Sequence, residues 1–140
     1  MVSKAFTRED DDAPEPPVRR LGLPVPVPNP VTAAGLRALR TELDAGPTGE
    51  RARELTEHLA TAITVEPTDR AAVGFGATVT VVDEAGRRHT YRIVGAIEAA
   101  PRDGAIGWQS PIATALHDAR VGDTVTLPRG DVEIVAISYP

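Results

Sequence analysis

The chain has 140 residues, a formal net charge of −5 and no cysteine. This length suits one medium domain, or a small domain with an appendage. The acidic balance argues against direct, sequence-independent binding of nucleic acid, although it permits a protein partner with a basic groove. The lack of thiols excludes disulfides, cysteine nucleophiles and thiolate zinc sites. The first residues are acidic and do not form a secretory signal, and no apolar run is long enough to cross a membrane, so we expect a cytoplasmic protein.

Residues 1–30 are rich in proline and are predicted to form a disordered, solvated arm. Prolines remove backbone donors and fix φ, so neither a helix nor an inner strand can persist there. They stand at Pro14, Pro16, Pro17, Pro24, Pro26, Pro28 and Pro30. An alternative is an extended strip that docks on the domain or on a partner, because four apolar residues of the arm could bury. These are Leu21, Leu23, Val25 and Val27.

Residues 31–65 have the pattern of two short helices. Thr32 suits the N-cap position, and leucines follow it at the spacing of one helical face. The segment 46–49 (Gly-Pro-Thr-Gly) breaks this helix, and Thr48 or Glu50 begins a second one. The apolar faces comprise Leu36, Leu39 and Leu43 in the first helix, then Ala52, Leu55, Leu59 and Ala62 or Ile63 in the second. Because such short helices are marginal alone in water, we expect an antiparallel hairpin with Asp44 and Glu50 beside its tip.

Residues 66–140 are predicted to form a small domain rich in strands. From Val73 the apolar period changes to two, which is typical of strands with one buried face. Strands are expected at 77–82, 88–94, 105–108, 121–127 and 132–137. Ser110 and Pro111 have the residue types of an N-cap and a first helical position, so a short helix should begin there. The predicted fold class is therefore α+β, with a short helical hairpin followed by a mainly antiparallel sheet packed on one short helix.

Few residues of the sequence indicate chemistry of their own. The histidines are His58, His89 and His117, and no pair has a metal-ligand spacing. We interpret all three as exposed polar residues of helices or strands. Asp123 after Gly122 is interpreted as a turn residue that bonds its own backbone. Trp108 is either a core residue or a partly exposed docking anchor, because tryptophan is enriched at interface hot spots.

Several stretches resemble the C-terminal domain of the GreA/GreB family of bacterial transcription elongation factors. They are the segments 73–81 (VGFGATVTV), 91–95 (YRIVG), 110–116 (SPIATAL) and 121–125 (VGDTV). The segment 32–43 is similar to the family's opening helix, T-x-x-G-x-x-x-L-x-x-E-L. The resemblance implies an FKBP-like fold for residues 66–140, and docking on RNA polymerase at the rim of the secondary channel. It also implies a coiled coil that enters this channel, whose acidic tip helps to hold a magnesium ion for cleavage of backtracked RNA.

The helical hairpin departs from the family pattern. It is far shorter than a cleavage factor's coiled coil, and the acidic tip motif has no match in the chain. The hairpin is more similar to that of Rnk-type proteins, which carry a truncated coiled coil. We therefore expect a regulator that binds RNA polymerase without stimulating transcript cleavage, rather than a cleavage factor that brings Asp44 or Glu50 to magnesium. The expected protein is a monomer, is not an enzyme, and uses neither a cofactor nor a metal.

The docking surface cannot be read directly from a motif. We predict that it includes polar or aromatic residues near turns, namely Trp108, Arg120, Asp123, Arg102 and Asp103. The alternative function is an FKBP-like protein-interaction module whose proline-rich arm binds a different partner.

Overall fold

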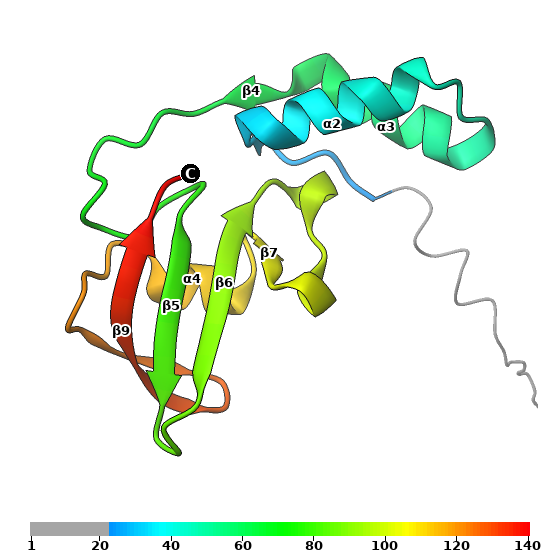
Figure 1. The fold of residues 1–140 in the computed structure, drawn as a ribbon. Coiled ribbons are helices and arrows are strands. Elements are labelled where there is room, and N and C mark those ends of the chain that lie inside the picture. The colour runs from blue at the N-terminus through cyan, green and yellow to red at the C-terminus, as the bar shows by residue number, and fades with distance from the viewer. Residues whose placement is uncertain (1–22) are drawn as a thin grey trace, which may run out of the picture.

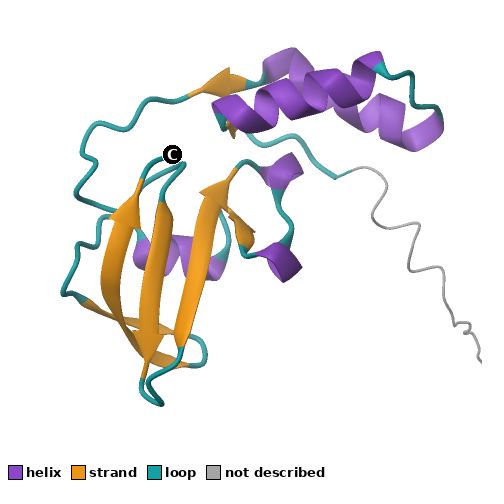
Figure 2. Cartoon of the chain, viewed as in Figure 1, coloured by secondary structure: helices purple, strands orange, loops and turns teal. Residues whose placement is uncertain are grey.

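The computed structural model describes residues 23–140 and has an α+β architecture (Figures 1 and 2). A unit of two helices lies beside a curled sheet with one short helix. The helical unit contains β3 (Pro30–Val31), α2 (Ala33–Asp44), α3 (Gly49–Thr61) and β4 (Ile63–Thr64). The sheet domain contains the remaining elements. Among residues 23–140, none of the helices combines the length and the apolar character needed to cross a membrane.

The two long helices pack side by side through the leucine faces that the sequence indicates. Thr32 caps α2, and its hydroxyl accepts a hydrogen bond from the backbone N–H of Gly35 at 2.9 Å. The four residues between the helices turn the chain, and Gly46 has a φ of 80° that favours glycine. The fully or nearly buried core of this unit consists of Val31, Leu39, Leu55 and Ile97, with Leu36, Leu43, Leu59 and Ala62 packed around it. Ile97 comes from the sheet domain, so the two units share this core.

The end of the predicted arm belongs to the helical unit, which corrects the expectation of a solvated segment up to residue 30. Asn29 is 2% exposed, and β3 pairs with β4 in parallel, with Pro30 opposite Ile63. Residues 23–28 are more open, and Val27 is 93% exposed. Of the residues named for the alternative of a docked strip, Val25 is half-buried, whereas Leu23 and Val27 are exposed. Residues 1–22, including Leu21, lie outside the described residues.

His58 is buried, so its interpretation as an exposed helix residue is wrong. Its side chain is among the largest fully buried ones, and the residue is 1% exposed. Asn29 donates a hydrogen bond from Nδ2 to the backbone oxygen of His58 at 2.8 Å. The segment before β3 therefore covers the face of α3 that carries His58. The spacing of apolar residues gave no sign of this burial, because the covering segment is irregular and rich in proline.

The sheet has five strands in the order β7-β6-β5-β9-β8. They are β5 (Thr78–Asp83), β6 (Arg88–Val94), β7 (Ala105–Gly107), β8 (Thr124–Leu127) and β9 (Gly130–Ser138). All neighbours are antiparallel except β6 and β7, which are parallel. The mainly antiparallel sheet is thus confirmed. Strand β8 begins later than predicted, because Gly122 has a φ of 96° and forms a turn with Asp123.

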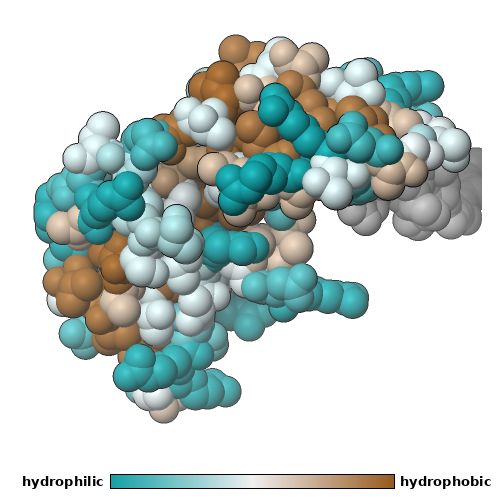
Figure 3. Space-filling view, turned by 45° about the horizontal axis from the view of Figure 1, so that its top comes forward, coloured by the Kyte–Doolittle hydropathy of each residue, from teal (hydrophilic) through white to brown (hydrophobic). Residues whose placement is uncertain are grey.

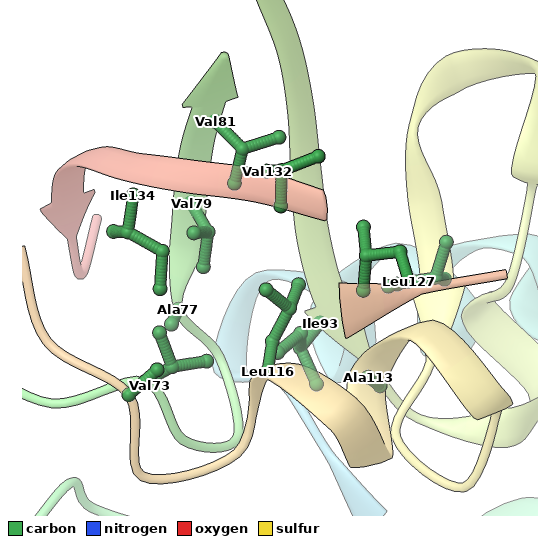
Figure 4. Close-up of a cluster of buried hydrophobic side chains, with 12 residues drawn as sticks. Val73, Ala77, Val79, Val81, Ile93, Ala113, Leu116, Leu127, Val132 and Ile134 are labelled. Atoms are coloured by element: carbon green, nitrogen blue, oxygen red, sulfur yellow. The ribbon is translucent and has the colours of Figure 1, made fainter. Parts of the chain in front are cut away.

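The helix α4 (Pro111–Leu116) covers one face of the sheet. Ser110 caps it as expected, accepting a hydrogen bond from the N–H of Ala113 at 3.3 Å. Figure 4 shows side chains of β5 and β9 gathered with Leu116 and Ala113 of this helix. Alternate residues of β5, such as Val79 and Val81, are fully buried there. The apolar period of two in the sequence therefore marks the face of the sheet that packs on α4.

Two short 3-10 turns complete the sheet domain between β6 and β7. They are η2 (Ala96–Glu98) and η3 (Pro101–Asp103). The chain between β4 and β5 forms the linker, residues 65–71, which is exposed apart from the half-buried Pro67. The linker runs around one side of the molecule, whereas η2 meets the helical unit on the other side (Figure 1). The two units are therefore connected covalently at one place and packed together at another.

Candidate functional site

The docking residues predicted from the sequence lie on opposite edges of the sheet. Arg102 and Asp103 belong to η3, which directly precedes the outer strand β7. Arg120 and Asp123 directly precede β8, the outer strand on the other side. Because β6, β5 and β9 separate these edges, the two pairs do not form one continuous surface. A single partner element would contact one pair or the other.

Arg120 and Asp123 have structural partners of their own. The Asp123 carboxylate accepts a hydrogen bond from the backbone N–H of Arg120 at 2.9 Å, which is the turn role predicted for Asp123. The Arg120 guanidinium forms an ion pair with Asp69 of the linker. The pKa of Asp69 is lowered, first by the N–H of Ala71 and then by Arg120. These contacts hold the linker against the sheet domain.

Trp108 lies between β7 and α4 and is half-buried against the main core. Its indole Nε1 is buried and has no hydrogen-bond partner among the described residues. Its backbone N–H donates to the oxygen of Val94 at 2.9 Å. Trp108 therefore packs against the core and is also partly exposed, so its role as a docking anchor stays a prediction.

The hairpin tip carries separated acidic side chains. Asp44 ends α2, whereas Glu50 in the first turn of α3 pairs with Arg53 at 3.3 Å. Glu42 is engaged by Arg51, and this hydrogen bond lowers the pKa of Glu42. Residues 23–140 contain no group of three or more histidine or acidic side chains that could hold a metal ion. The tip therefore presents no ready-made carboxylate cluster.

A cleft of about 590 Å³ lies at the end of the sheet where the β5–β6 and β8–β9 turns meet. Residues 83–85, 87, 89, 91, 112 and 127–132 line it. Its apolar part is formed by Tyr91, Ile112, Leu127 and Val132, and the last two are 7% exposed. The antiparallel pairing of β9 with both β5 and β8 brings the two turns to this end. The docking cleft, as we call it, thus combines an apolar floor with a polar rim.

Asp83 organises one side of the docking cleft. Its carboxylate accepts hydrogen bonds from the backbone N–H groups of Ala85 and Arg87, both at 2.9 Å, and lies 2.9 Å from Nε2 of His89. The hydrogen bond with His89 is the main reason that the pKa of Asp83 is lowered, and the N–H of Arg87 adds to it. The carboxylate is therefore ionised at neutral pH and fixes the β5–β6 turn.

The opposite side of the cleft is built on the β8–β9 turn. Thr126 donates a hydrogen bond from its hydroxyl to Asp131 at 2.8 Å, which fixes the turn around Arg129. Arg129 and Glu84 add charges of both signs to the lining. An apolar floor with a charged rim is the arrangement typical of a protein-protein contact. The cleft suits an apolar side chain of a partner flanked by charged groups.

Only indirect signals of this cleft are present in the sequence. Both turns were expected, and His89 was interpreted as an exposed strand residue, as it is. What the sequence did not reveal is that β5, β9 and β8 are neighbours in the sheet. Without that order, Asp83 and Arg129 could not be placed near each other. The alternation of β6, which turns His89 and Tyr91 to one face, was the signal that could have pointed to the cleft.

Comparison with known proteins identifies the sheet domain. The family model described as "Transcription elongation factor, GreA/GreB, C-term" matches residues 67–139. The chain belongs to the GreA/GreB family. This match begins in the linker and covers all five strands and α4. The resemblance seen in the sequence is thereby confirmed.

Curated relatives extend the match toward the helical unit. The chain is 42% identical over 96 residues to transcription elongation factor GreB of Neisseria meningitidis serogroup B, covering 64% of this chain and 59% of the relative. It is 42% identical over 85 residues to transcription elongation factor GreA of Nautilia profundicola, covering 57% of this chain and 52% of the relative. The chain thus spans between half and three-fifths of the length of these relatives.

Solved structures of the family are also similar to the chain. GreA factor homolog 1 (Gfh1) of Thermus thermophilus has a TM-score of 0.45 and 23% identity, covering 78% of this chain and 97% of that protein. The GreA/GreB elongation factor of Nitrosomonas europaea has a TM-score of 0.45 and 22% identity, with coverage of 79% and 98%.

Proposed function

We propose that this chain binds RNA polymerase through its sheet domain and regulates elongation as a Gre/Rnk-type factor, near the secondary channel. The observation that carries this proposal is the family match over residues 67–139, which spans the whole sheet. The relatives that match at 42% identity are transcription elongation factors. RNA polymerase is accordingly the partner on which a factor of this family acts.

The proposed factor does not stimulate transcript cleavage. Helix α2 has 12 residues, so the hairpin reaches only about 18 Å at a rise of 1.5 Å per residue. Both ends of the hairpin are internal to the chain, with Thr32 capping α2 and Ala62 ending α3. A magnesium ion needs oxygen ligands that converge. Asp44 and Glu50, one of them paired with Arg53, are poorly suited to supply them at a channel's far end.

We place polymerase docking at the docking cleft. Its apolar floor and charged rim lie on the end of the sheet domain away from the helical unit, so both parts of the chain can engage the polymerase. The two edges that carry Arg102 with Asp103, and Arg120 with Asp123, are the competing docking surfaces. Arg120 is the weaker candidate because Asp69 already occupies its guanidinium.

The same proposal covers the way the protein works. It acts as a monomer in the cytoplasm, without a cofactor or a reaction of its own, and its net charge of −5 disfavours direct sequence-specific or general binding of nucleic acid. FKBP-like folding of residues 66–140 remains part of the proposal. An FKBP-like fold does not by itself predict catalytic activity, because fold does not imply function.

A backtracked elongation complex tests this function. The chain is added in excess, followed by a full-length Gre factor, and the length of the RNA is measured on a gel. We expect the chain alone to leave the RNA unchanged and to suppress shortening by the Gre factor, because both occupy the same place. Shortening by the chain alone would contradict the absence of cleavage stimulation. Unchanged Gre activity, with no binding of the chain to core polymerase, would favour the alternative of a protein-interaction module.

A specific observation supports that alternative. Val27, in the proline-rich segment before β3, is 93% exposed, and Ile63 and Val65 beside α3 are 49% and 45% exposed. Figure 3 shows apolar surface on the helical unit. Retention of a binding partner by residues 1–30 alone would assign the interaction to the arm rather than to the sheet domain.

A further inference from the structure

Glu98 lies where the helical unit and the sheet domain meet. It is the last residue of η2 and is half-buried. Its Oε2 atom accepts hydrogen bonds from the backbone N–H of Gly95 at 2.8 Å and of Thr32 at 2.9 Å. Its Oε1 atom accepts a hydrogen bond from the hydroxyl of Thr32 at 2.5 Å. One carboxylate therefore joins the sheet domain to the residue that caps α2.

Thr32 continues this contact into the helix. Its hydroxyl donates to Glu98 and at the same time accepts from the N–H of Gly35 at 2.9 Å. The carboxylate thus stands at the N-terminal end of α2, where the helix dipole favours negative charge. Hydrogen bonds to an ionised group are also stronger than those between neutral groups. The position of α2 is consequently tied to that of η2.

Two glycines make room for the contact. A Cβ atom at Gly35 would lie 1.9 Å from Oε1 and 2.4 Å from Cδ of Glu98. A Cβ atom at Gly95 would lie 2.4 Å from the backbone oxygen of Pro30. Neither glycine has a positive φ, so space rather than backbone freedom accounts for them. We call Thr32, Gly35, Gly95 and Glu98 the latch.

The latch, rather than the linker, determines how the units are oriented. Ile97, next to Glu98, is 9% exposed and packs into the core of the helical unit with Leu39 and Leu55. The linker, in contrast, is almost fully exposed and runs around the other side of the molecule. The ion pair between Asp69 and Arg120 holds the end of the linker on the sheet domain, whereas residues 65, 66 and 68, nearer to the helical unit, are exposed. Polar and apolar contacts at η2 therefore set the direction in which the hairpin points.

We propose that Glu98 is a positioning residue, which holds the hairpin in one orientation so that the hairpin and the docking cleft engage RNA polymerase together. Its role in polymerase binding rests on the proposed function, whereas its role in orientation does not. Linking two contacts rigidly raises the effective concentration of the second, and this gain is lost when the geometry is free. Glu98 thereby acts on a partner that it does not touch.

Distance measurements between spin labels test the orientation in the full chain. The chain has no cysteine, so Ala45→Cys at the hairpin tip and Thr114→Cys on α4, both exposed positions, take the labels. We expect a narrow distance distribution in the parent and a clearly broader one in Glu98→Ala, with helix content by circular dichroism unchanged. Glu57→Ala, which removes an exposed carboxylate of α3, is the matched control and should keep the narrow distribution. An unchanged distribution in Glu98→Ala would overturn the proposal.

Gly35→Ala gives a second, independent variant. It raises helix propensity, so failure to fold is not expected, but its methyl group displaces the Glu98 carboxylate. We expect it to broaden the same distance distribution as Glu98→Ala does. Glu98→Gln, which keeps the shape and one acceptor oxygen, should give an intermediate width. A narrow distribution in Gly35→Ala would contradict the latch even if Glu98→Ala misfolded.

Binding to core RNA polymerase separates this inference from the proposed function. We expect Glu98→Ala to lower the affinity of the full chain for core polymerase by about tenfold, and Glu57→Ala to leave it unchanged. If the parent does not bind polymerase, the proposed function fails, but the distance distributions still decide whether the latch orients the hairpin. If the parent binds and Glu98→Ala binds equally well with a broadened distribution, the latch orients the hairpin without serving binding, and the positioning role is refuted.

Discussion

The ring of His58 on α3 contacts the backbone of Leu23, with Nε2 lying 3.1 Å from the carbonyl oxygen of that residue. A carbonyl oxygen can only accept, so Nε2 carries the proton and donates. The backbone oxygen of His58 in turn accepts from Asn29. A single helical residue thus fastens both ends of the segment that precedes β3.

Replacing His58 should destabilise the helical unit. His58→Ala leaves a cavity and an unpaired carbonyl oxygen at Leu23, and we expect a loss of about 2–3 kcal/mol in the free energy of unfolding. His117→Ala is the control, because the His117 side chain is 64% exposed, and it should change stability by less than about 0.5 kcal/mol. Urea unfolding followed by circular dichroism measures both. Equal effects of the two variants would refute a structural role for the buried ring.

Arg51 joins the two helices of the hairpin. Its Nε and one terminal nitrogen donate to the two carboxylate oxygens of Glu42 at 2.6 and 2.7 Å, and the other terminal nitrogen donates to Glu54 at 2.6 Å. Lysine cannot form this two-pronged contact. We expect Arg51→Lys to lower stability by about 0.5 kcal/mol, since the pair is exposed. Arg53→Lys, whose ion pair lies within one helix, should lower stability less in the same urea experiment. Equal losses of stability in the two variants would contradict a special role for the two-pronged contact between Arg51 and Glu42.

The latch predicts strong coupling between two substitutions. In the parent, Gly35→Ala forces the Glu98 carboxylate aside, and we expect it to lower the free energy of unfolding by about 1–2 kcal/mol. In a chain that already carries Glu98→Ala, the methyl group no longer meets the carboxylate but still lies 2.8 Å from the hydroxyl oxygen of Thr32, so a part of this loss should disappear. A double-mutant cycle by urea unfolding should therefore give an interaction energy of about 1 kcal/mol or more. Additive effects would mean that the two residues do not interact.

Asp83 makes the sheet domain sensitive to acid. Its pKa in the folded chain is lowered by His89 and by backbone N–H groups. Near this pKa the folded chain therefore binds fewer protons than the unfolded chain does. The stabilisation is complete above the ordinary pKa of aspartate, about 3.9, and is lost as the pH falls through the lowered pKa. Asp83→Asn should remove this part of the pH dependence. Urea unfolding midpoints at pH 5 and pH 3 for the parent and the variant measure this dependence. If the midpoint falls equally in both chains between these pH values, Asp83 is not a source of the acid sensitivity.

The docking cleft and the η3 edge make opposite predictions for charge reversal. Arg129 lines the cleft, whereas Arg102 lies on η3 at the outer strand β7. We expect Arg129→Glu to weaken binding to core RNA polymerase by about tenfold or more and Arg102→Glu to leave it nearly unchanged. Titration of labelled chain with core polymerase at fixed salt measures both. The reverse order would assign docking to the surface that the sequence predicted.

Local signals made much of the fold predictable. The leucine spacing located both helices, and the alternation around Val79 and Val81 located the buried face of the sheet. Thr32, Ser110 and Pro111 marked helix starts through their residue types alone. Such features depend only on residues a few positions apart, so they can be predicted from the sequence alone.

Contacts between distant segments were not predictable in the same way. The burial of His58 depends on a proline-rich segment that packs without a regular pattern. The docking cleft depends on the strand order, and the latch depends on a carboxylate that meets Thr32 from 66 residues away. Gly35 was visible as part of a family pattern, but its reason, the space for Glu98, required the structure.

The sharing of Ile97 between the two units has a consequence for synthesis on the ribosome. The helices α2 and α3 leave the ribosome well before residue 97 does, and their leucine faces then lack the side chain that completes the core. Thr32 can cap α2 at once, but its hydroxyl gains Glu98 only later. The nascent hairpin therefore exposes apolar surface for the time needed to add roughly 35 residues, a few seconds at about 5–20 residues per second. During this interval the exposed apolar surface of the hairpin is available for chaperones to bind.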